Sequence, residues 1–208
     1  MAPKKQQKKG HAEAPVETIF QLLVSLGEPP DRVWRRVLVS SRTRFSELHT
    51  LLQLVMGWGD EHEHQFLVHE KHYGPDEQDA EPRIYDERKP SLASRLEVGD
   101  EFHYLYDFGD SWEHRITVTR VRQGDPDIAY PRYLGGCGAG PPEDCGGVPG
   151  FYDLLGARAD PDHPEHAQAV EWLDDYDPDE VEVLPIKYAL DRIAARRNAA
   201  KTRLGKKT

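Results

Sequence analysis

Two short runs near the N-terminus alternate apolar and polar residues. The first, Thr18–Leu26, repeats apolar side chains at Leu22, Val24 and Leu26 with the period of two that is typical of a half-buried strand. Gly27 and the prolines that follow it interrupt this run. The second run, Val33–Val39, is rich in β-branched residues. We therefore predict two strands, joined by a connection that is longer than a tight hairpin.

A helical pattern comes next. Between Thr43 and Met56 apolar side chains recur at spacings of three and four, with Thr43 as the expected N-cap and Gly57 as the stop. The segment His64–His69 then predicts a strand. Residues 71–90 are polar and contain prolines, so we predict a long loop there.

The second half of the chain predicts a hairpin followed by helices. Strands at Glu101–Asp107 and Trp112–Val121 flank a good turn at 108–111. Residues 130–150 are rich in glycine and proline, and we expect a long irregular loop. Helices are expected at Phe151–Ala157, Glu165–Leu173 and Pro185–Ala200.

This order of elements, β-β-α-β-β-β and then helices, contains few βαβ units. It favours an α+β fold with an antiparallel sheet, helices packed on one side and a long Gly/Pro-rich loop.

Charge distinguishes the ends of the chain from its body. The formal net charge is −10, but residues 1–10 and 192–208 carry only basic charges, which leaves about −21 for residues 11–191. We expect residues 1–15 and 201–208 to be disordered basic tails on a single domain spanning 16–200. The acidic body would repel phosphates, so nucleic acid would be contacted through the tails; alternatively, the tails are only solvated ends.

The composition also bears on compartment. No apolar run approaches the ~20 residues of a membrane span, and the first residues lack the apolar core of a signal peptide. Two cysteines do not form a secreted disulfide scaffold. We expect a cytoplasmic protein without a membrane partner.

Four polar clusters could carry chemistry. His62 and His64 are two residues apart, so in a strand they would share one face and could bind one zinc-like divalent ion. Around the predicted hairpin turn, a second cluster could form a binding pocket with the first; it consists of Asp107, Asp110, Trp112 and His114. The structural alternatives are solvated histidines, an aspartate that shapes the turn and a tryptophan in the core.

The other two clusters lie later in the chain. Cys137 and Cys145 supply half of a tetrahedral metal site at most, and Glu143 and Asp144, which lie between them, are candidates for the same binding pocket. A rigid turn with reduced cysteines explains the same residues. His163 and His166 flank a proline at a predicted helix start, where they could be metal ligands or part of the helix entry.

Taken together and in this order, these segments resemble the plasmid pRiA4b ORF-3-like family, whose members are also described as passenger or resolvase-like proteins of insertion elements. The resemblance spans about residues 18–190, and the segments that carry it are 34–39, 45–49, 56–64, 106–114, 141–147, 160–166 and 172–173. It implies a compact α+β fold and an association with plasmids and mobile elements, and it implies no particular activity.

Three functions remain open from the sequence. The first is a cytosolic binding module with a polar His/Asp/Glu/Cys pocket. The second is a metal-dependent hydrolase or nuclease that uses this pocket, with Glu143 or Asp144 as the base. The third is a nucleic-acid accessory protein that docks through its basic tails.

Overall fold

The structure is a computed structural model that describes residues 17–27, 32–75 and 81–205. Its strands are β1 (Thr18–Leu26), β2 (Val33–Ser40), β3 (His64–Val68), β4 (Lys71–Gly74), β5 (Ile84–Asp86), β6 (Glu101–Tyr106), β7 (Trp112–Gln123) and β8 (Arg132–Cys137). Its helices are α1 (Phe45–Met56), α2 (Gly147–Ala159), α3 (His166–Leu173) and α4 (Val183–Gly205), with a short 3-10 helix at Leu92–Ser94.

The strands form one sheet in the order β5-β4-β3-β6-β7-β1-β2-β8. Neighbouring strands are antiparallel, except that β5 runs parallel to β4. The prediction of an α+β fold built on an antiparallel sheet is confirmed.

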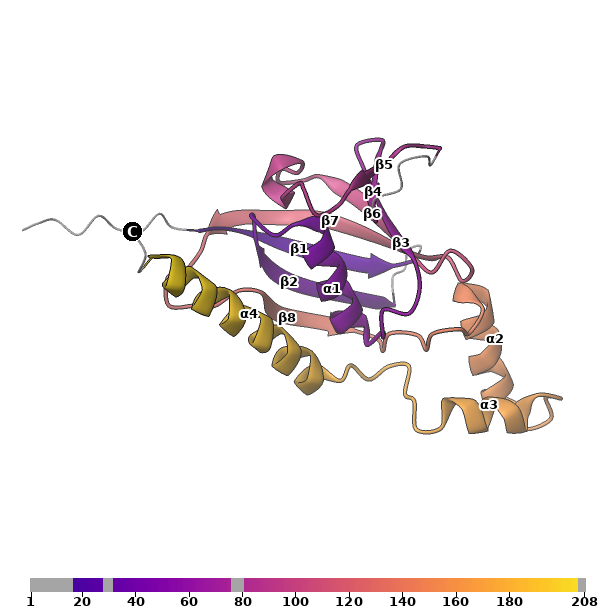
Figure 1. The fold of residues 1–208 in the computed structure, drawn as a ribbon. Helices are drawn as coiled ribbons and strands as arrows, with labels where there is room; N and C mark the ends of the chain where they lie inside the picture. Colours follow the sequence, from indigo (N-terminus) through magenta and orange to yellow (C-terminus); the bar gives the residue numbers. More distant parts are fainter. Residues whose placement is uncertain (1–16, 28–31, 76–80, 206–208) are drawn as a thin grey trace, which may run out of the picture.

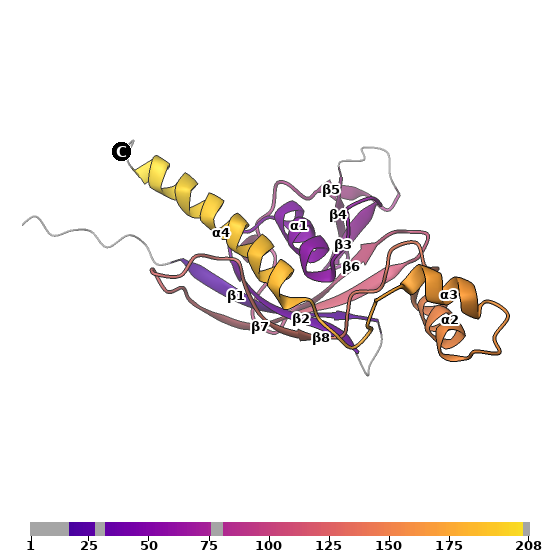
Figure 2. The same cartoon turned by 90° about the horizontal axis from the view of Figure 1, so that it is seen from below.

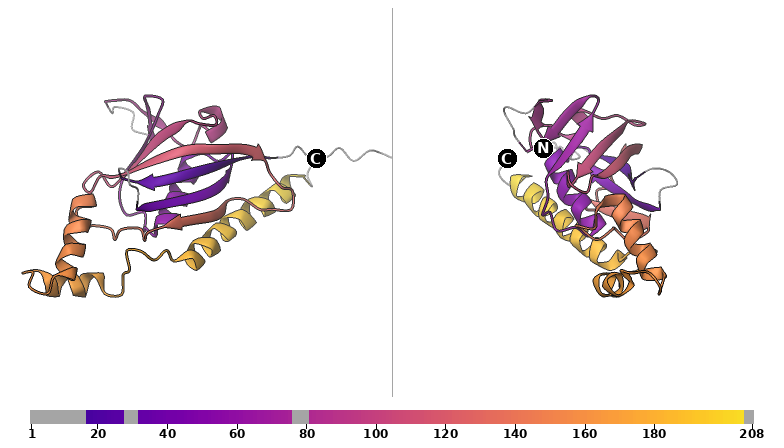
Figure 3. Two further views of the ribbon diagram at one scale, coloured as in Figure 1. Left: turned by 180° about the vertical axis from the view of Figure 1, so that it is seen from behind. Right: turned by 90° about the vertical axis from the view of Figure 1, so that its right-hand side faces the viewer.

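The helices occupy two places relative to this sheet. Helix α1 lies against one face, and α4 lies beside it, in contact with both α1 and the edge strand β8 (Figures 1 and 2). Helices α2 and α3 pack against each other beyond one end of the sheet (Figure 3). In the described part of the chain, no helix combines the length and the apolar character that crossing a membrane requires.

The core lies between the sheet and α1. Phe45 and Leu48 of α1 are fully buried, and the ring of Phe45 stacks on Tyr73 with 5.2 Å between centroids. Burying each such side chain contributes roughly 1.5–3 kcal/mol. The N-cap of α1 is Arg44, not the expected Thr43, because the Glu47 carboxylate accepts the Arg44 backbone N–H at 2.8 Å.

The prediction of a loop over residues 71–90 was wrong. The segment contains β4 and β5, which extend the sheet beyond β3. Tyr73, which is 2% exposed, anchors β4 in the core against α1. A four-residue strand whose two buried residues, Tyr73 and Gly74, are adjacent cannot show a period of two, so only its pairing with β3 makes it a strand.

Residues 130–150 are also more regular than predicted. Strand β8 pairs with β2, and α2 begins at Gly147. Gly136 permits this pairing, because a Cβ there would lie 2.7 Å from the Trp34 carbonyl oxygen. At the C-terminus α4 continues to Gly205, so residues 201–205 are helical where we predicted disorder. The tail at 1–15 lies outside the described residues.

A candidate metal site at one end of the sheet

Three connections meet beyond the end of strands β3 and β6. They are the α1–β3 connection with His62, the β6–β7 turn with Asp107, and the β8–α2 connection with Asp144. The pairing of His64 with Tyr106 sets the first two in register, and the Asp107 backbone N–H donates to the Glu63 carbonyl oxygen at 2.8 Å. His62 is therefore held opposite Asp107.

The third connection is fixed by Glu143 and Trp58. The Glu143 carboxylate accepts the Gly59 backbone N–H at 2.8 Å and the Tyr106 hydroxyl at 2.5 Å. The Trp58 indole N–H donates to the Pro141 carbonyl oxygen at 2.8 Å. Burial, and then the neighbouring Glu143 carboxylate, raise the pKa of Tyr106 far above its usual value, so its hydroxyl remains a donor.

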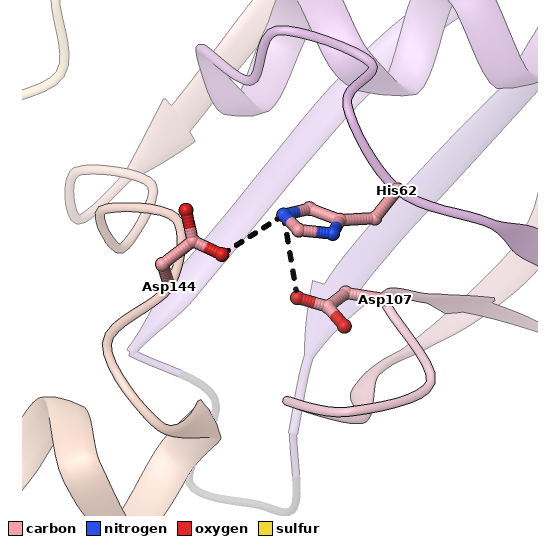
Figure 4. Close-up of side chains that lie close together, drawn as sticks. All are labelled: His62, Asp107 and Asp144. Carbon is pink, nitrogen blue, oxygen red and sulfur yellow. Dashed lines mark ion pairs between the residues drawn. The ribbon is translucent and has the colours of Figure 1, made fainter.

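His62 lies between two carboxylates from these connections (Figure 4). Its Nε2 is 3.0 Å from Asp144 Oδ1 and 3.6 Å from Asp107 Oδ2. Neither contact has the geometry of a hydrogen bond, although the Nε2 atom is buried. An N–H group on Nε2 would thus be poorly placed toward both oxygens.

The two carboxylate oxygens of Asp107 have different contacts, one in the turn and one in this cluster. Its Oδ1 accepts the backbone N–H groups of Gly109 at 2.9 Å and Asp110 at 3.2 Å. Its Oδ2 faces His62. Both Asp107 and Asp144 have a positive φ, of 57° and 58°, which is uncommon outside glycine but tolerated best by aspartate and asparagine.

The three residues are candidate ligands for a divalent cation. One atom from each, the His62 nitrogen and two carboxylate oxygens, lies within 4.8 Å of the other two. Ligand atoms about 2.1 Å from a shared ion lie roughly 3–4 Å apart. One nitrogen and two oxygens suit zinc, manganese or iron better than calcium or magnesium, which prefer oxygen alone.

His64 belongs to a different cluster. Its Nε2 lies 2.9 Å from Glu87 Oε2, and its ring stacks on His49 with 3.5 Å between centroids. His49 in turn contacts the Tyr104 hydroxyl at 2.8 Å and Asp60 Oδ1 at 2.7 Å. The expectation that His62 and His64 act on one ion does not hold, because β3 begins only at His64 and His62 precedes the strand.

Two further candidates are core residues. Trp112 and His114 are both 0% exposed, and each packs against the Trp58 ring. His114 Nδ1 lies 3.0 Å from the Trp112 carbonyl oxygen. Burial lowers the pKa of His114 to about 4, so its ring is neutral at pH 7. For Trp112 the structural alternative of a core tryptophan describes what is found, whereas His114 is a buried core histidine, an alternative that we did not name from the sequence.

Asp110 holds the helix α2 to the hairpin. Its Oδ2 accepts the Gly146 backbone N–H at 3.1 Å, at the N-cap of α2. Gly147 follows so closely that a Cβ there would lie 2.2 Å from the Asp110 carbonyl oxygen. Asp110 is thus a positioning residue at the edge of the candidate site.

The remaining candidates do not belong to this three-residue cluster. Cys137 is exposed at the end of β8, and Cys145 is buried, which raises the pKa of its thiol to about 11 and disfavours the thiolate that binds metals. Both thiols are free. His163 Nδ1 accepts the Glu165 backbone N–H and His166 Nδ1 contacts the Ala157 carbonyl oxygen, so both histidines stabilise the α2–α3 connection.

Sequence reasoning missed Glu87, His49 and Asp60. Glu87 is 7% exposed and lies in the segment that we predicted to be a loop, so nothing in the sequence indicated that its side chain is buried. His49 lies on the buried face of α1, one residue after Leu48, and the helical period could have placed it there.

The comparisons with known proteins bear on the family and the fold. Residues 18–184 match the model of the family described as plasmid pRiA4b ORF-3-like protein. The chain is 37% identical over 188 residues to the uncharacterized protein y4hQ of Sinorhizobium fredii, covering 87% of this chain and 95% of that protein. The crystal structure of a protein of unknown function, MM3350 from Methanosarcina mazei Go1, has a TM-score of 0.73 and 30% identity, covering 84% of this chain and 98% of that one. The chain belongs to the plasmid pRiA4b ORF-3-like protein family.

Proposed function

We propose that this protein is a metal-dependent binding module that holds one divalent ion of the zinc, manganese or iron class. His62, Asp107 and Asp144 are the proposed ligands. The observation that carries the proposal is the meeting of these three ligand atoms within 4.8 Å, around a buried imidazole nitrogen without a hydrogen bond.

Metal titration of protein purified without a metal-affinity tag tests this proposal. We expect one ion per chain by calorimetry and elemental analysis. His62→Ala should weaken binding by about ten- to a hundredfold, because it removes the single nitrogen ligand. His163→Ala is the matched control, since His163 lies in the α2–α3 connection, and it should bind like the wild type. Equal loss in both variants, or no binding by the wild type, would refute the proposal.

A metal-dependent hydrolase is the second candidate, and the openness of the site favours it. The Asp144 side chain is 68% exposed, and three protein ligands leave coordination positions for water and substrate. Glu143 is not the base in this scheme, because both of its oxygens accept hydrogen bonds. Metal-stimulated cleavage of a phosphodiester or a single-stranded DNA, lost in Asp107→Asn, would support this function. Metal binding without any cleavage would exclude the hydrolase and support the metal-dependent binding module.

We further propose that the module works in the cytoplasm and is carried by mobile DNA. The support is the family's description, which names a plasmid reading frame. Basic residues of α4, including Arg192, Arg196 and Arg203, offer contacts to nucleic acid that the acidic body does not.

A further inference from the structure

Strand β2 buries an arginine at a position where the alternation of core-facing and outward-facing residues predicts an apolar side chain. Val33, Arg35 and Val37 share the core-facing side of β2, and Arg35 is 1% exposed. Burial lowers the pKa of Arg35, but a guanidinium remains charged at pH 7. A full positive charge therefore lies inside the protein.

Among the described residues, the hydrogen bonds of Arg35 leave its Nη2 without a partner. Nε donates to the Val55 carbonyl oxygen at 2.7 Å, and Nη1 donates to the carbonyl oxygens of Trp34 and Cys137, both at 2.9 Å. The two N–H groups of Nη2 take no part in these bonds. Within the described ranges no carboxylate lies within ion-pair distance of this side chain. Buried charges are normally paired, so this arrangement indicates a counter-ion that comes from outside.

Arg35 also lines a cavity of about 460 Å³, which is the size of a small-molecule site. The cavity lies at the C-terminal end of α1, between that helix, residues 139–140 and the segment 175–186 that leads into α4. Its apolar wall includes Leu54, Val181 and Ile186.

The mouth of the same cavity is acidic. Its lining includes the acidic residues Asp175, Asp177, Glu180 and Glu182, all of which are exposed. The carbonyl end of α1 adds a partial negative charge. A simple anion would be repelled by this mouth, and a simple cation would be repelled by Arg35.

We propose that this cavity binds a small zwitterion of the α-amino-acid type. Its carboxylate would accept hydrogen bonds from Arg35 Nη2, and its ammonium group would face the acidic residues of the mouth. An aliphatic side chain fits the apolar wall. The cavity shares no residue with the His62, Asp107 and Asp144 cluster, so this is a second site.

Binding of the proteinogenic L-α-amino acids to the full chain tests this proposal. We expect at least one aliphatic amino acid to raise the melting temperature and to give a saturable calorimetric isotherm at millimolar concentration. Its N-acetyl derivative lacks the ammonium group and its amide lacks the carboxylate, so both should bind about ten- to a hundredfold more weakly. Equal binding of either derivative would overturn the zwitterion, and no binding by any amino acid would overturn the site.

Two variants locate the binding. Arg35→Lys keeps the charge but loses the planar fork, and it should weaken binding by about tenfold or more. Arg35 is buried in the core, so its substitution can also affect folding. The double variant Glu180→Gln and Glu182→Gln changes only exposed residues, so it should retain the fold and should also weaken binding. Glu171→Gln on α3 is the matched control, and it should bind the amino acid like the wild type. Unchanged affinity in the Glu180/Glu182 variant would contradict the proposed orientation.

Discussion

At the scale of the residue, Asp107 serves the fold and the site with different oxygens. One oxygen accepts two backbone N–H groups and so shapes the β6–β7 turn, while the other faces His62. The residue also adopts a left-handed backbone that aspartate and asparagine accept more readily than alanine. Its structural role and its proposed metal-binding role can therefore be separated by two substitutions.

We expect Asp107→Asn to retain stability and to lose metal binding. An asparagine side-chain oxygen can accept the same turn hydrogen bonds, but it carries no charge for a cation. Asp107→Ala removes the hydrogen bonds as well and should lower the free energy of unfolding by roughly 1–3 kcal/mol. Urea unfolding and metal titration of both variants measure this. If Asp107→Asn were as unstable as Asp107→Ala, the charge itself would be structural.

At the scale of the element, glycine contacts place α2 against the hairpin. Gly147 has a φ of 68° and approaches the Asp110 carbonyl oxygen too closely for a side chain. Gly156, in the same helix, has no atom within 4 Å of the position that a Cβ would occupy. The two positions form a matched pair, because the same substitution to alanine places a Cβ against a carbonyl oxygen at Gly147 and in open space at Gly156.

We expect Gly147→Ala to destabilise the protein and Gly156→Ala to stabilise it. The first change forces a backbone clash and a strained φ, at a cost of roughly 1–3 kcal/mol or more. The second removes a flexible glycine from a helix, which contributes up to about 1 kcal/mol. Thermal and urea unfolding report both values. Since Asp144 lies close before α2, Gly147→Ala should also weaken metal binding; an unchanged affinity would show that the site does not depend on how α2 docks.

At the scale of the whole molecule, buried imidazoles couple stability to pH. Burial lowers the pKa of His114 to about 4, and burial followed by the neighbouring His64 lowers that of His49. Both rings are therefore neutral in the folded protein at a pH where they would bind a proton in the unfolded chain.

We expect stability to fall as the pH is lowered from 7 toward 4. The pKa of His114 in the folded protein lies below its unfolded value of 6.5. The stabilising contribution of the neutral ring is therefore complete above pH 6.5 and is lost as the pH falls from 6.5 to about 4. For His114 the full loss is roughly 3 kcal/mol. Urea unfolding at a series of pH values measures it, and His114→Gln, which cannot titrate, should show a smaller slope. A free energy of unfolding that is constant from pH 7 to 5 would contradict this account.

The sequence by itself determined the elements that bury one continuous face. β1, β2, β6, β7 and α1 have local apolar periods, and their predicted bounds agree with the structure to within about two residues. β4, β5 and β8 lack such a period. β4 forms because Tyr73 packs in the core, and β8 forms because Gly136 lets two backbones approach each other. Both contacts depend on partners that are distant in sequence.

The same distinction holds for the site. Among twelve candidate positions, residue types singled out His62 as a possible metal ligand, Asp107 as a pocket residue, and Asp144 as a pocket residue or base. Only the pairing of β3 with β6 and the Glu143 contacts to Gly59 and Tyr106 bring these three together. The same pairing turns His64 toward Glu87 and encloses His114 in the core. Ligand chemistry belongs to single residues and can be recognised in the sequence, whereas a shared ion needs distances of a few ångströms between separate connections, and those distances are set by tertiary packing.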